Sequence, residues 1–323
     1  MTKAVILAGG HGTRLRPLTN IMPKPLVPLA GKTLIDRLIS TLPETVDEII
    51  VAAGYMGKEM EEHFRNFHCQ VEVVTEHEPL GTAGALFQLR QRLNDTFIVL
   101  NGDVISSLNI KEMIEFHRKK KAVATISVWT VQDASSFGAL RLDGDGRINE
   151  FREKPRFPEP GPSPINAGTY VMESEIFDYM DISNLSLERE IFPKLVNGRM
   201  YGYSFEGYWI DCGTRENYLK AQSLLLEMEG HTVHSASRLN GCVINRPLGI
   251  EQGARLEGAR IGPNVYIERG VTIGEGSTVE ESTVLAGARI GRHCTIRRSI
   301  ICPGAVVEDN TEQEDIILGA AIH

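Results

Sequence analysis

The chain has 323 residues, of which 42% are hydrophobic and 24% charged, and its formal net charge is −8. A chain of this length and apolar content can fill a complete core, and we expect it to form two domains. The negative charge excludes a broad surface for nucleic acid or anionic membranes, so any phosphate must be bound locally. Five scattered cysteines without metal-ligand spacing, and the lack of a leader or membrane-length apolar run, lead us to expect an unprocessed cytoplasmic protein.

From residue 1 to about 228, short apolar strands alternate with amphipathic helices. We expect strands at 3–8, 48–53, 71–75, 96–100 and 123–131, and helices at 33–42, 56–66, 82–93, 110–120, 187–196 and 214–229. This alternation predicts an α/β domain with a mainly parallel, twisted sheet. The run Asp-Gly-Asp-Gly at 143–146 predicts a hairpin turn between two further short strands.

A glycine-rich loop follows the first strand, with glycines at 9, 10 and 12. Such a loop can wrap closely around phosphate, and Arg14, Arg16 and Lys24 add the cations that a nucleoside triphosphate requires. Two other glycine motifs are excluded. Prolines at 17, 23, 25 and 28 prevent the helix of a dinucleotide motif, and Leu26 stands where a Walker motif ending in Gly31-Lys32-Thr33 needs its first glycine.

A second polar group follows a later predicted strand. Asp103, in the run Asn101-Gly102-Asp103, comes directly after the apolar residues 97–100. Ligands of open α/β sheets bind at the carboxyl ends of the strands, so we expect Asp103 and the glycine-rich loop to face one cleft. A carboxylate placed there can hold magnesium beside substrate phosphates.

The sequence changes character after about residue 241. Aliphatic residues recur six apart at 261, 267, 273 and 279, then at 284, 290 and 296 after one five-residue step, and then at 301 and 307. This period predicts a β-helix of about three to four coils, whose flat sides suit self-association into a homo-oligomer.

Taken together, these motifs resemble those of the sugar-1-phosphate nucleotidyltransferases. The resemblance rests on residues 13–19 with Pro23-Lys24-Pro25, on Phe-x-Glu-Lys-Pro at 151–155, on Asn-Ala-Gly at 166–168 and on 208–214. It implies a Rossmann-like nucleotidyltransferase domain at 1–228, a linker at 229–241, and a left-handed parallel β-helix of hexapeptide repeats at 242–323. Within the family, 80–84, 186–193 and 207–211 are most similar to mannose-1-phosphate guanylyltransferases.

The resemblance also implies a reaction and a set of site residues. A nucleoside triphosphate and a sugar 1-phosphate would give a nucleotide sugar and pyrophosphate, with Mg²⁺ as cofactor. The implied catalytic residues are Arg14, Lys24 and Asp103; the nucleotide-binding residues are Leu7, Ala8, Gly9, Gly10, Gly12, Thr13, Arg14, Gly81 and Thr82; the sugar-phosphate-binding residues are Gly138, Glu153, Lys154, Asn166 and Gly168; and the metal ligands are Asp103 and Asp211.

The sequence leaves several functions open. The motifs are compatible with GTP and mannose 1-phosphate, and also with another base or with glucose, N-acetylglucosamine or heptose 1-phosphate. A regulatory subunit that binds a nucleotide sugar without making it is a second hypothesis. A third is an added acyltransferase activity of the repeats, in which His293 lies.

Overall fold

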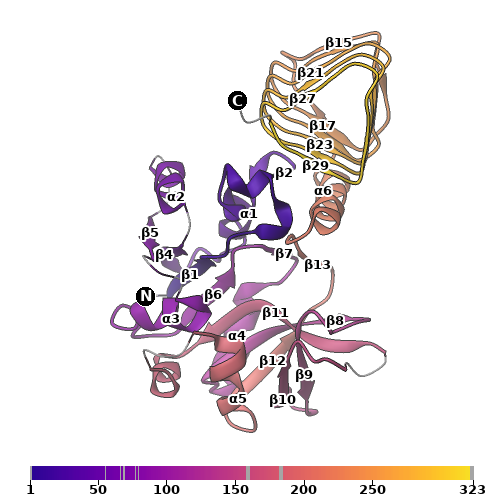
Figure 1. Ribbon diagram of the computed structural model, residues 1–323. Helices are drawn as coiled ribbons and strands as arrows, with labels where there is room; N and C mark the ends of the chain where they lie inside the picture. The colour runs from indigo at the N-terminus through magenta and orange to yellow at the C-terminus, as the bar shows by residue number, and fades with distance from the viewer. Residues whose placement is uncertain are drawn as a thin grey trace. The chain divides into compact units, whose positions relative to one another are not determined.

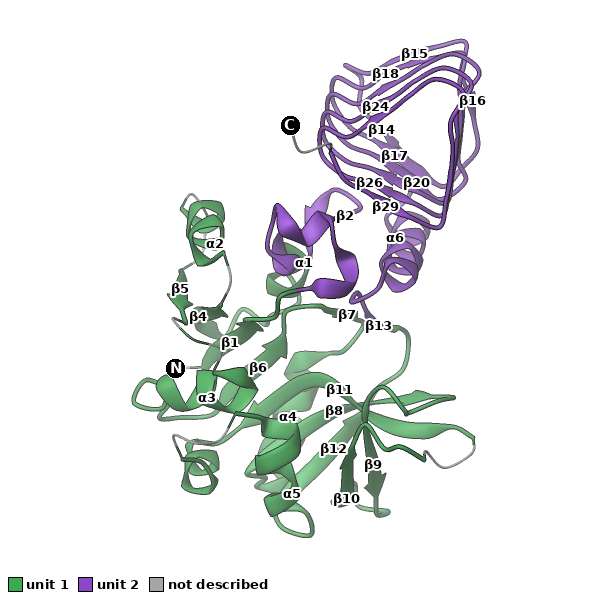
Figure 2. Cartoon of the chain, in the orientation of Figure 1, with its two compact units in different colours: residues 1–11, 35–209 green, residues 12–34, 210–323 purple. Residues whose placement is uncertain are grey.

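The computed structural model describes residues 2–54, 56–65, 67, 70–76, 78, 80–157, 161–181 and 185–320. The chain divides into two compact units, coloured separately in Figure 2. Unit 1 comprises residues 1–11 and 35–209, and unit 2 comprises residues 12–34 and 210–323. The segment expected to bind phosphate, 12–34, therefore belongs to the unit that contains the C-terminal repeats.

Unit 1 is built on a large twisted sheet (Figure 1). Its parallel part has the order β6-β1-β4-β5, formed by β6 (Phe97–Asn101), β1 (Thr2–Ala8), β4 (Val46–Ala53) and β5 (Val71–Thr75). All four strands were predicted. Ala4, Val5 and Ile6 in β1 are fully buried, as expected for a strand that is covered on both faces.

The other part of this sheet is mixed. The long strand β11 (Ser163–Met172) runs antiparallel to β6, to β8 (Ala124–Val131) and to β9 (Gly138–Leu142). β12 (Met200–Ser204) pairs in parallel with β8, and β9 forms the predicted hairpin with β10 (Ile148–Glu153). Strand β11 was not predicted, because Asn166 and Gly168 interrupt its apolar pattern. The register also shifts there, between Asn166 and Tyr170.

The helices of unit 1 fall inside the ranges that the periodicity predicted, except that α3 begins one residue earlier, at Gly81. Two irregular turns accompany them, a 3₁₀ turn η4 (Ser174–Tyr179) and a π turn η5 (Leu187–Ile191), and the short strand β7 (Val104–Ser106) follows β6. The Asn109 side chain accepts a hydrogen bond from Glu112 N at 3.3 Å and so caps the helix that follows it. The helices are α1 (Leu34–Ile39), whose first residue lies in unit 2, α2 (Gly57–Phe64), α3 (Gly81–Gln88), α4 (Ile110–Lys120) and α5 (Phe192–Leu195).

Unit 2 contains a parallel β-helix with three faces (Figure 1). Arg238, Arg255, Thr272, Arg289 and Val306 pair in succession, so each coil is 17 residues long, which matches two six-residue steps and one five-residue step. Its buried core contains the predicted series of aliphatics, together with further small and aliphatic residues between them. The handedness stays a prediction from the resemblance.

The β-helix is longer than the three to four coils expected from the sequence, because its faces contain six, five and five strands. Its first strands, β14 (Thr232–Val233) and β15 (Arg238–Asn240), fall within 229–241, where a linker was expected. These end strands are mostly exposed and polar, as is β28 (Glu312–Glu314), so the aliphatic period does not reveal them.

The remaining β-helix strands make the three faces in turn. The first face continues with β17 (Leu248–Ile250), β20 (Val265–Ile267), β23 (Thr283–Val284), β26 (Ile300–Ile301) and β29 (Ile317–Leu318). The second continues with β18 (Arg255–Glu257), β21 (Thr272–Ile273), β24 (Arg289–Ile290) and β27 (Val306–Val307). The third adds β16 (Val243–Ile244), β19 (Arg260–Ile261), β22 (Thr278–Glu280) and β25 (Thr295–Arg297).

The other elements of unit 2 precede the β-helix. Helix α6 (Arg215–Glu229), whose N-cap is Thr214, leads into the first coil. Segment 12–34 contains the 3₁₀ turns η1 (Thr13–Leu15), η2 (Leu18–Asn20) and η3 (Lys24–Leu26) and the hairpin of β2 (Pro28–Leu29) with β3 (Lys32–Thr33). Strand β13 (Trp209–Asp211) lies where the chain passes from unit 1 to unit 2.

A search of all the described helices for one long and apolar enough to span a membrane finds none.

Candidate active site

Two cations of segment 12–34 lie beside one carboxylate. Leu15 and Leu18 are fully buried, so the short turns that contain them leave Arg14 on the surface, with 62% of its side chain exposed. Lys24 differs, because only 9% of its side chain is exposed. Arg14 Nη2 lies 3.9 Å from Asp211 Oδ2, and Lys24 Nζ lies 4.0 Å from Asp211 Oδ1. The structure therefore brings together three predicted site residues, Arg14, Lys24 and Asp211. The first two lie near the start of the expected catalytic domain, 1–228, and the third lies near its end.

The absence of a side chain at Gly213 allows the Arg14 guanidinium to lie close to Asp211. This glycine was not singled out from the sequence. A Cβ atom at Gly213 would lie 2.7 Å from Asp211 Oδ1 and 3.1 Å from Arg14 Cζ, closer than side chains tolerate. The guanidinium thus lies directly against the backbone two residues after the carboxylate. The only available signal was that Gly213 stands within the family-like run 208–214.

Gly12 performs a related role within the same segment. Its φ of +59° lies in the left-handed region, and a Cβ there would be 2.9 Å from Thr19 Cγ2 and 3.2 Å from Lys24 Cβ. The hydroxyl of Thr19 donates a hydrogen bond to Gly12 O at 2.8 Å. The predicted Gly12 is therefore needed for the turn that sets Thr13 and Arg14 beside Lys24.

In unit 1, the start of the glycine-rich loop lies at the carboxyl end of β1. A Cβ at Gly54 would lie 2.9 Å from Gly9 O, and one at Gly102 would lie 2.8 Å from Leu7 O. The end of β1 and the loop after it thus pack backbone to backbone against the loops after β4 and β6. The predicted residues Leu7, Ala8 and Gly9 lie at this contact. Asp103 follows Gly102 in the turn between β6 and β7, at the same edge of the sheet.

Glu76 also lies at this edge, and the sequence did not indicate it. A Cβ at Gly9 would lie 3.5 Å from Glu76 Oε2, and Leu80 N donates a hydrogen bond to that oxygen at 3.2 Å. Burial raises the pKa of Glu76, and the Leu80 amide opposes that rise. A carboxylate thus stands between the glycine-rich loop and the segment that leads to the predicted nucleotide-binding residues Gly81 and Thr82.

The predicted sugar-phosphate residues meet at the junction of β9, β10 and β11. A Cβ at Gly138 would lie 3.0 Å from Glu153 Oε2 and 3.4 Å from Asn166 Cβ, and Gly168 N donates to Asn166 Oδ1 at 3.0 Å. Lys154, with a φ of +46°, places its Nζ 3.7 Å from Glu153 Oε1. All five predicted residues therefore belong to one cluster in unit 1.

Glu188 connects this cluster to the predicted nucleotide-binding loop. Thr82 Oγ1 donates to Glu188 Oε2 at 2.9 Å, Tyr170 Oη donates to Glu188 Oε1 at 3.4 Å, and Asn166 Nδ2 donates to Tyr170 Oη at 3.0 Å. Burial, and then the negative charge of Glu188, raise the pKa of Glu153. Sequence reasoning used the run at 186–190 only as a family likeness and missed this link.

The donor set limits how a metal could be bound. Among the residues that the structure describes, no cluster of three or more His, Cys, Asp or Glu side chains could hold a metal ion. One or two carboxylates do fit a hard divalent ion that takes its other ligands from substrate phosphates and water. Asp211 fits this role chemically, since its carboxylate supplies hard oxygen ligands and lies beside two cations that are expected to bind phosphate.

Two cations beside a carboxylate in unit 2, and a cluster of carboxylate and amide groups on the α/β sheet of unit 1, are typical of nucleotide-dependent transferases. A sequence model of the family described as "Nucleotidyl transferase" matches residues 3–228, and one described as "GMPPB C-terminal domain" matches residues 244–323. The chain belongs to the nucleotidyl transferase family. Enzymes of this family generally use a divalent metal.

Relatives with assigned names are similar along most of the chain. A mannose-1-phosphate guanylyltransferase of Mycobacterium tuberculosis is 35% identical over 297 residues, covering 84% of this chain and 82% of its own. Mannose-1-phosphate guanylyltransferase 1 of Arabidopsis thaliana is 36% identical, with 85% and 78% covered. The mannose-1-phosphate guanylyltransferase catalytic subunit beta of Xenopus tropicalis is 35% identical, with 70% and 65% covered.

Proposed function

We propose that this protein transfers a guanylyl group from GTP to mannose 1-phosphate, giving GDP-mannose and pyrophosphate. The observation that carries the proposal is the meeting of Arg14 and Lys24 at Asp211, in a member of the nucleotidyl transferase family. The names of the relatives support the choice of base and sugar.

The reaction requires no nucleophile from the protein. An oxygen of the sugar phosphate attacks the α-phosphorus in line and the bond to pyrophosphate breaks. The second pKa of a phosphate monoester is about 6, so the attacking dianion is already present at neutral pH. The main barrier is repulsion between two anions, which cations and exact positioning reduce.

We assign the roles of the residues accordingly. Arg14 binds the triphosphate and stabilises the charge that develops in the transition state, and the buried Lys24 binds phosphate near the reacting centre. Backbone amides of the glycine-rich loop and the segment at Gly81 and Thr82 hold the nucleotide. Gly138, Glu153, Lys154, Asn166 and Gly168 hold the sugar phosphate.

We further propose Mg²⁺ as the divalent ion and the carboxylates of Asp103 and Asp211 as its protein ligands. When bound, this ion would neutralise phosphate charge during the transfer. Asp103→Asn and Asp211→Asn should each remove most of the Mg²⁺-dependent activity, whereas Asp143→Asn, in the exposed hairpin turn, should not. Full activity in either of the first two variants would exclude that residue as a ligand.

Glu76 supports guanine as the base. Guanine presents two adjacent donors, N1–H and the 2-amino group, and a carboxylate can accept from both, whereas adenine offers a donor beside an acceptor. Glu76→Gln should therefore reduce the preference for GTP over ATP by about tenfold or more, since each good paired contact contributes about 1–3 kcal/mol of discrimination. An unchanged preference would remove Glu76 from base recognition.

The decisive experiment is a matrix of substrates. The four nucleoside triphosphates are combined with mannose, glucose, N-acetylglucosamine and heptose 1-phosphates, and pyrophosphate release is measured with Mg²⁺ present. We expect the highest kcat/KM for GTP with mannose 1-phosphate, and a loss of 100-fold or more in Arg14→Ala. A different preferred pair would correct the substrate, and no release with any pair would favour a regulatory subunit.

We make two further proposals, on the cellular location and on the oligomeric state of the enzyme. We propose a cytoplasmic protein that forms a homo-oligomer through the β-helix, because the four described cysteines are free and stacked coils present flat sides. Light scattering that detects only a monomer would exclude the oligomer.

A further inference from the structure

The β-helix unit contains segment 12–34, and the contacts between them are specific. The hydroxyl of Tyr218, on α6, donates a hydrogen bond to Pro28 O at the start of the β2–β3 hairpin. Tyr218 is fully buried. One end of the hairpin is therefore joined to α6 by a hydrogen bond from a buried tyrosine.

The turn of the same hairpin meets a second tyrosine, from β20 of the β-helix. A Cβ at Gly31 would lie 2.5 Å from Tyr266 Oη and 3.4 Å from Tyr266 Cζ. The hydroxyl of Tyr266 donates to Glu251 Oε1 at 2.7 Å, which fixes its direction. Gly31, with a φ of +87°, thus allows the hairpin turn to lie against the tyrosine hydroxyl.

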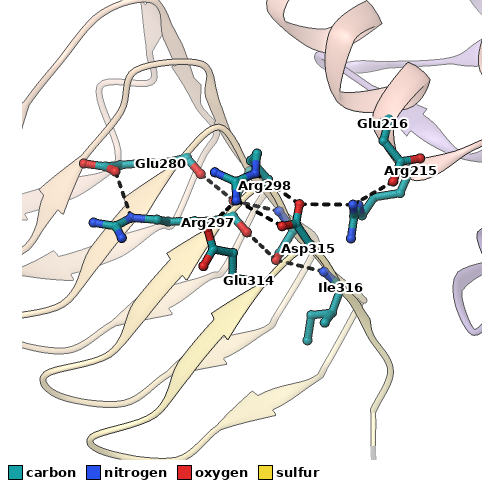
Figure 3. A network of polar contacts seen from close by, with 10 residues as sticks. Arg215, Glu216, Glu280, Arg297, Arg298, Glu314, Asp315 and Ile316 are labelled. Carbon is teal, nitrogen blue, oxygen red and sulfur yellow. Dashed lines mark hydrogen bonds and ion pairs between the residues drawn. The ribbon is translucent and has the colours of Figure 1, made fainter.

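Helix α6 is itself fastened to the coils, as Figure 3 shows at its first turn. Arg215 pairs with Asp315 at 3.1 Å, and Asp315 is also held by Arg298. Further along the helix, the fully buried Gln222 donates to Ser282 O at 3.2 Å and accepts from the hydroxyl of Thr283. Tyr218 therefore contacts the hairpin from a helix that cannot shift independently of the β-helix.

The hairpin is in turn continuous with the two proposed catalytic cations. Val27 N donates to Lys24 O at 3.0 Å, and Leu34 N donates to Val27 O at 3.1 Å, so the end of η3 and the base of the hairpin form one hydrogen-bonded unit. Val27 and Leu29 are fully buried. A displaced hairpin would thus carry Lys24 with it. Gly12 packs against Lys24, and Arg14 lies beside the same carboxylate as Lys24, that of Asp211.

We propose that Tyr218 and Tyr266 are positioning residues, through which the β-helix sets the place of Lys24 and Arg14 in the active site. This inference rests on the catalytic roles proposed for those two cations. The repeat domain would then be required for turnover in each subunit, in addition to any part it has in self-association.

A double-mutant cycle at Gly31 and Tyr266 tests this directly. A methyl group at Gly31 must move about 0.9 Å or more away from the hydroxyl to reach an ordinary contact distance. A misplacement near 1 Å can reduce turnover about 100-fold, so we expect Gly31→Ala to lower kcat/KM for GTP with mannose 1-phosphate by about 10- to 100-fold. Tyr266→Phe alone should stay within about threefold of the native enzyme, and Gly31→Ala/Tyr266→Phe should recover most of the loss, because the clashing oxygen is gone.

Two controls separate positioning from general damage. Gly287→Ala also places an alanine in the left-handed region, at φ +68°, with no atom within 4 Å of the new methyl group, and should leave kcat/KM unchanged. If Gly31→Ala does not fold, Tyr218→Phe gives the same information, with Tyr203→Phe as its control, because the Tyr203 hydroxyl bonds Glu112 in unit 1 at 3.1 Å. We expect a several-fold loss of kcat/KM in Tyr218→Phe alone.

The outcomes also distinguish this inference from the proposed function. Full activity of Gly31→Ala beside an inactive Arg14→Ala overturns the positioning role and leaves the catalytic roles intact. An equal loss in the single and double variants likewise overturns it. Full activity of Arg14→Ala overturns the catalytic assignment and this inference with it, whereas an inactive Gly31→Ala that the second substitution rescues supports both.

Discussion

The buried carboxyl group of Glu268 makes the stability of the β-helix depend on pH. Only 9% of this residue is exposed, and its Oε2 accepts a hydrogen bond from Ala286 N at 2.8 Å. Burial raises its pKa from 4.5 to about 7; the Ala286 amide opposes the rise, Glu251 adds to it and Arg269 opposes it. The folded chain therefore binds this proton more tightly than the unfolded chain does.

The sign and size of the effect follow from this difference. The contribution of Glu268 to stability is complete below about pH 4.5 and is lost as the pH rises through about 7. The loss corresponds to about 3 kcal/mol, since a tenfold change in proton affinity is worth about 1.4 kcal/mol. Glu268→Gln removes the charge and keeps an acceptor for the amide, so it should stabilise the protein by about 1–3 kcal/mol at pH 8 and by almost nothing at pH 4.5.

Urea unfolding of the full chain, followed by circular dichroism at pH 4.5, 6 and 8, measures this difference. Glu257→Gln, an exposed position on the same β-helix, serves as the control and should change the unfolding free energy little at any pH. The reasoning is refuted if Glu268→Gln is no more stable than the native chain at pH 8, or if its effect is the same at pH 4.5 and pH 8.

Three further predictions concern the active site. Gly213→Ala should displace the Arg14 guanidinium and lower kcat about 10- to 100-fold with little change in melting temperature; steady-state kinetics would refute this by showing normal kcat. Gly168→Ala, at φ +82° and with a methyl group 2.7 Å from an amide nitrogen, should raise the KM for sugar phosphate severalfold, while the open Gly144→Ala should not. Glu188→Gln should weaken binding of both substrates by about 1–2 kcal/mol in calorimetry, and a loss confined to one of them would contradict its linking role.

Much of the site was predictable because its chemistry is local in the sequence. Glycines at 9, 10 and 12 followed by Arg14 and Lys24 indicated phosphate binding, and the six-residue spacing of aliphatics indicated the β-helix, since a coil repeats its side-chain pattern along the chain. The cluster of Gly138, Glu153 and Asn166 was anticipated only through the family likeness. No spacing rule connects strands β9, β10 and β11.

The site residues that were not predicted from the sequence owe their place in the site to contacts with residues far away along the chain. Glu76, Glu188 and Gly213 look like ordinary surface or turn residues, and their positions matter only because Gly9, Thr82 and Arg14 fold against them. The polar end coils were missed for a different reason, since they contribute few buried aliphatics to the repeat.

The sequence by itself determined the two kinds of architecture, the phosphate-binding loop and the family, because periodicity and short motifs act within a few residues of each other. Only the tertiary structure decided that segment 12–34 belongs with the β-helix and contacts Tyr218 and Tyr266. The contacting residues Pro28 and Tyr218, and Gly31 and Tyr266, are about 190 to 235 residues apart in the sequence. Burial and hydrogen bonds in the folded state bring them together, and local sequence patterns do not reveal such contacts.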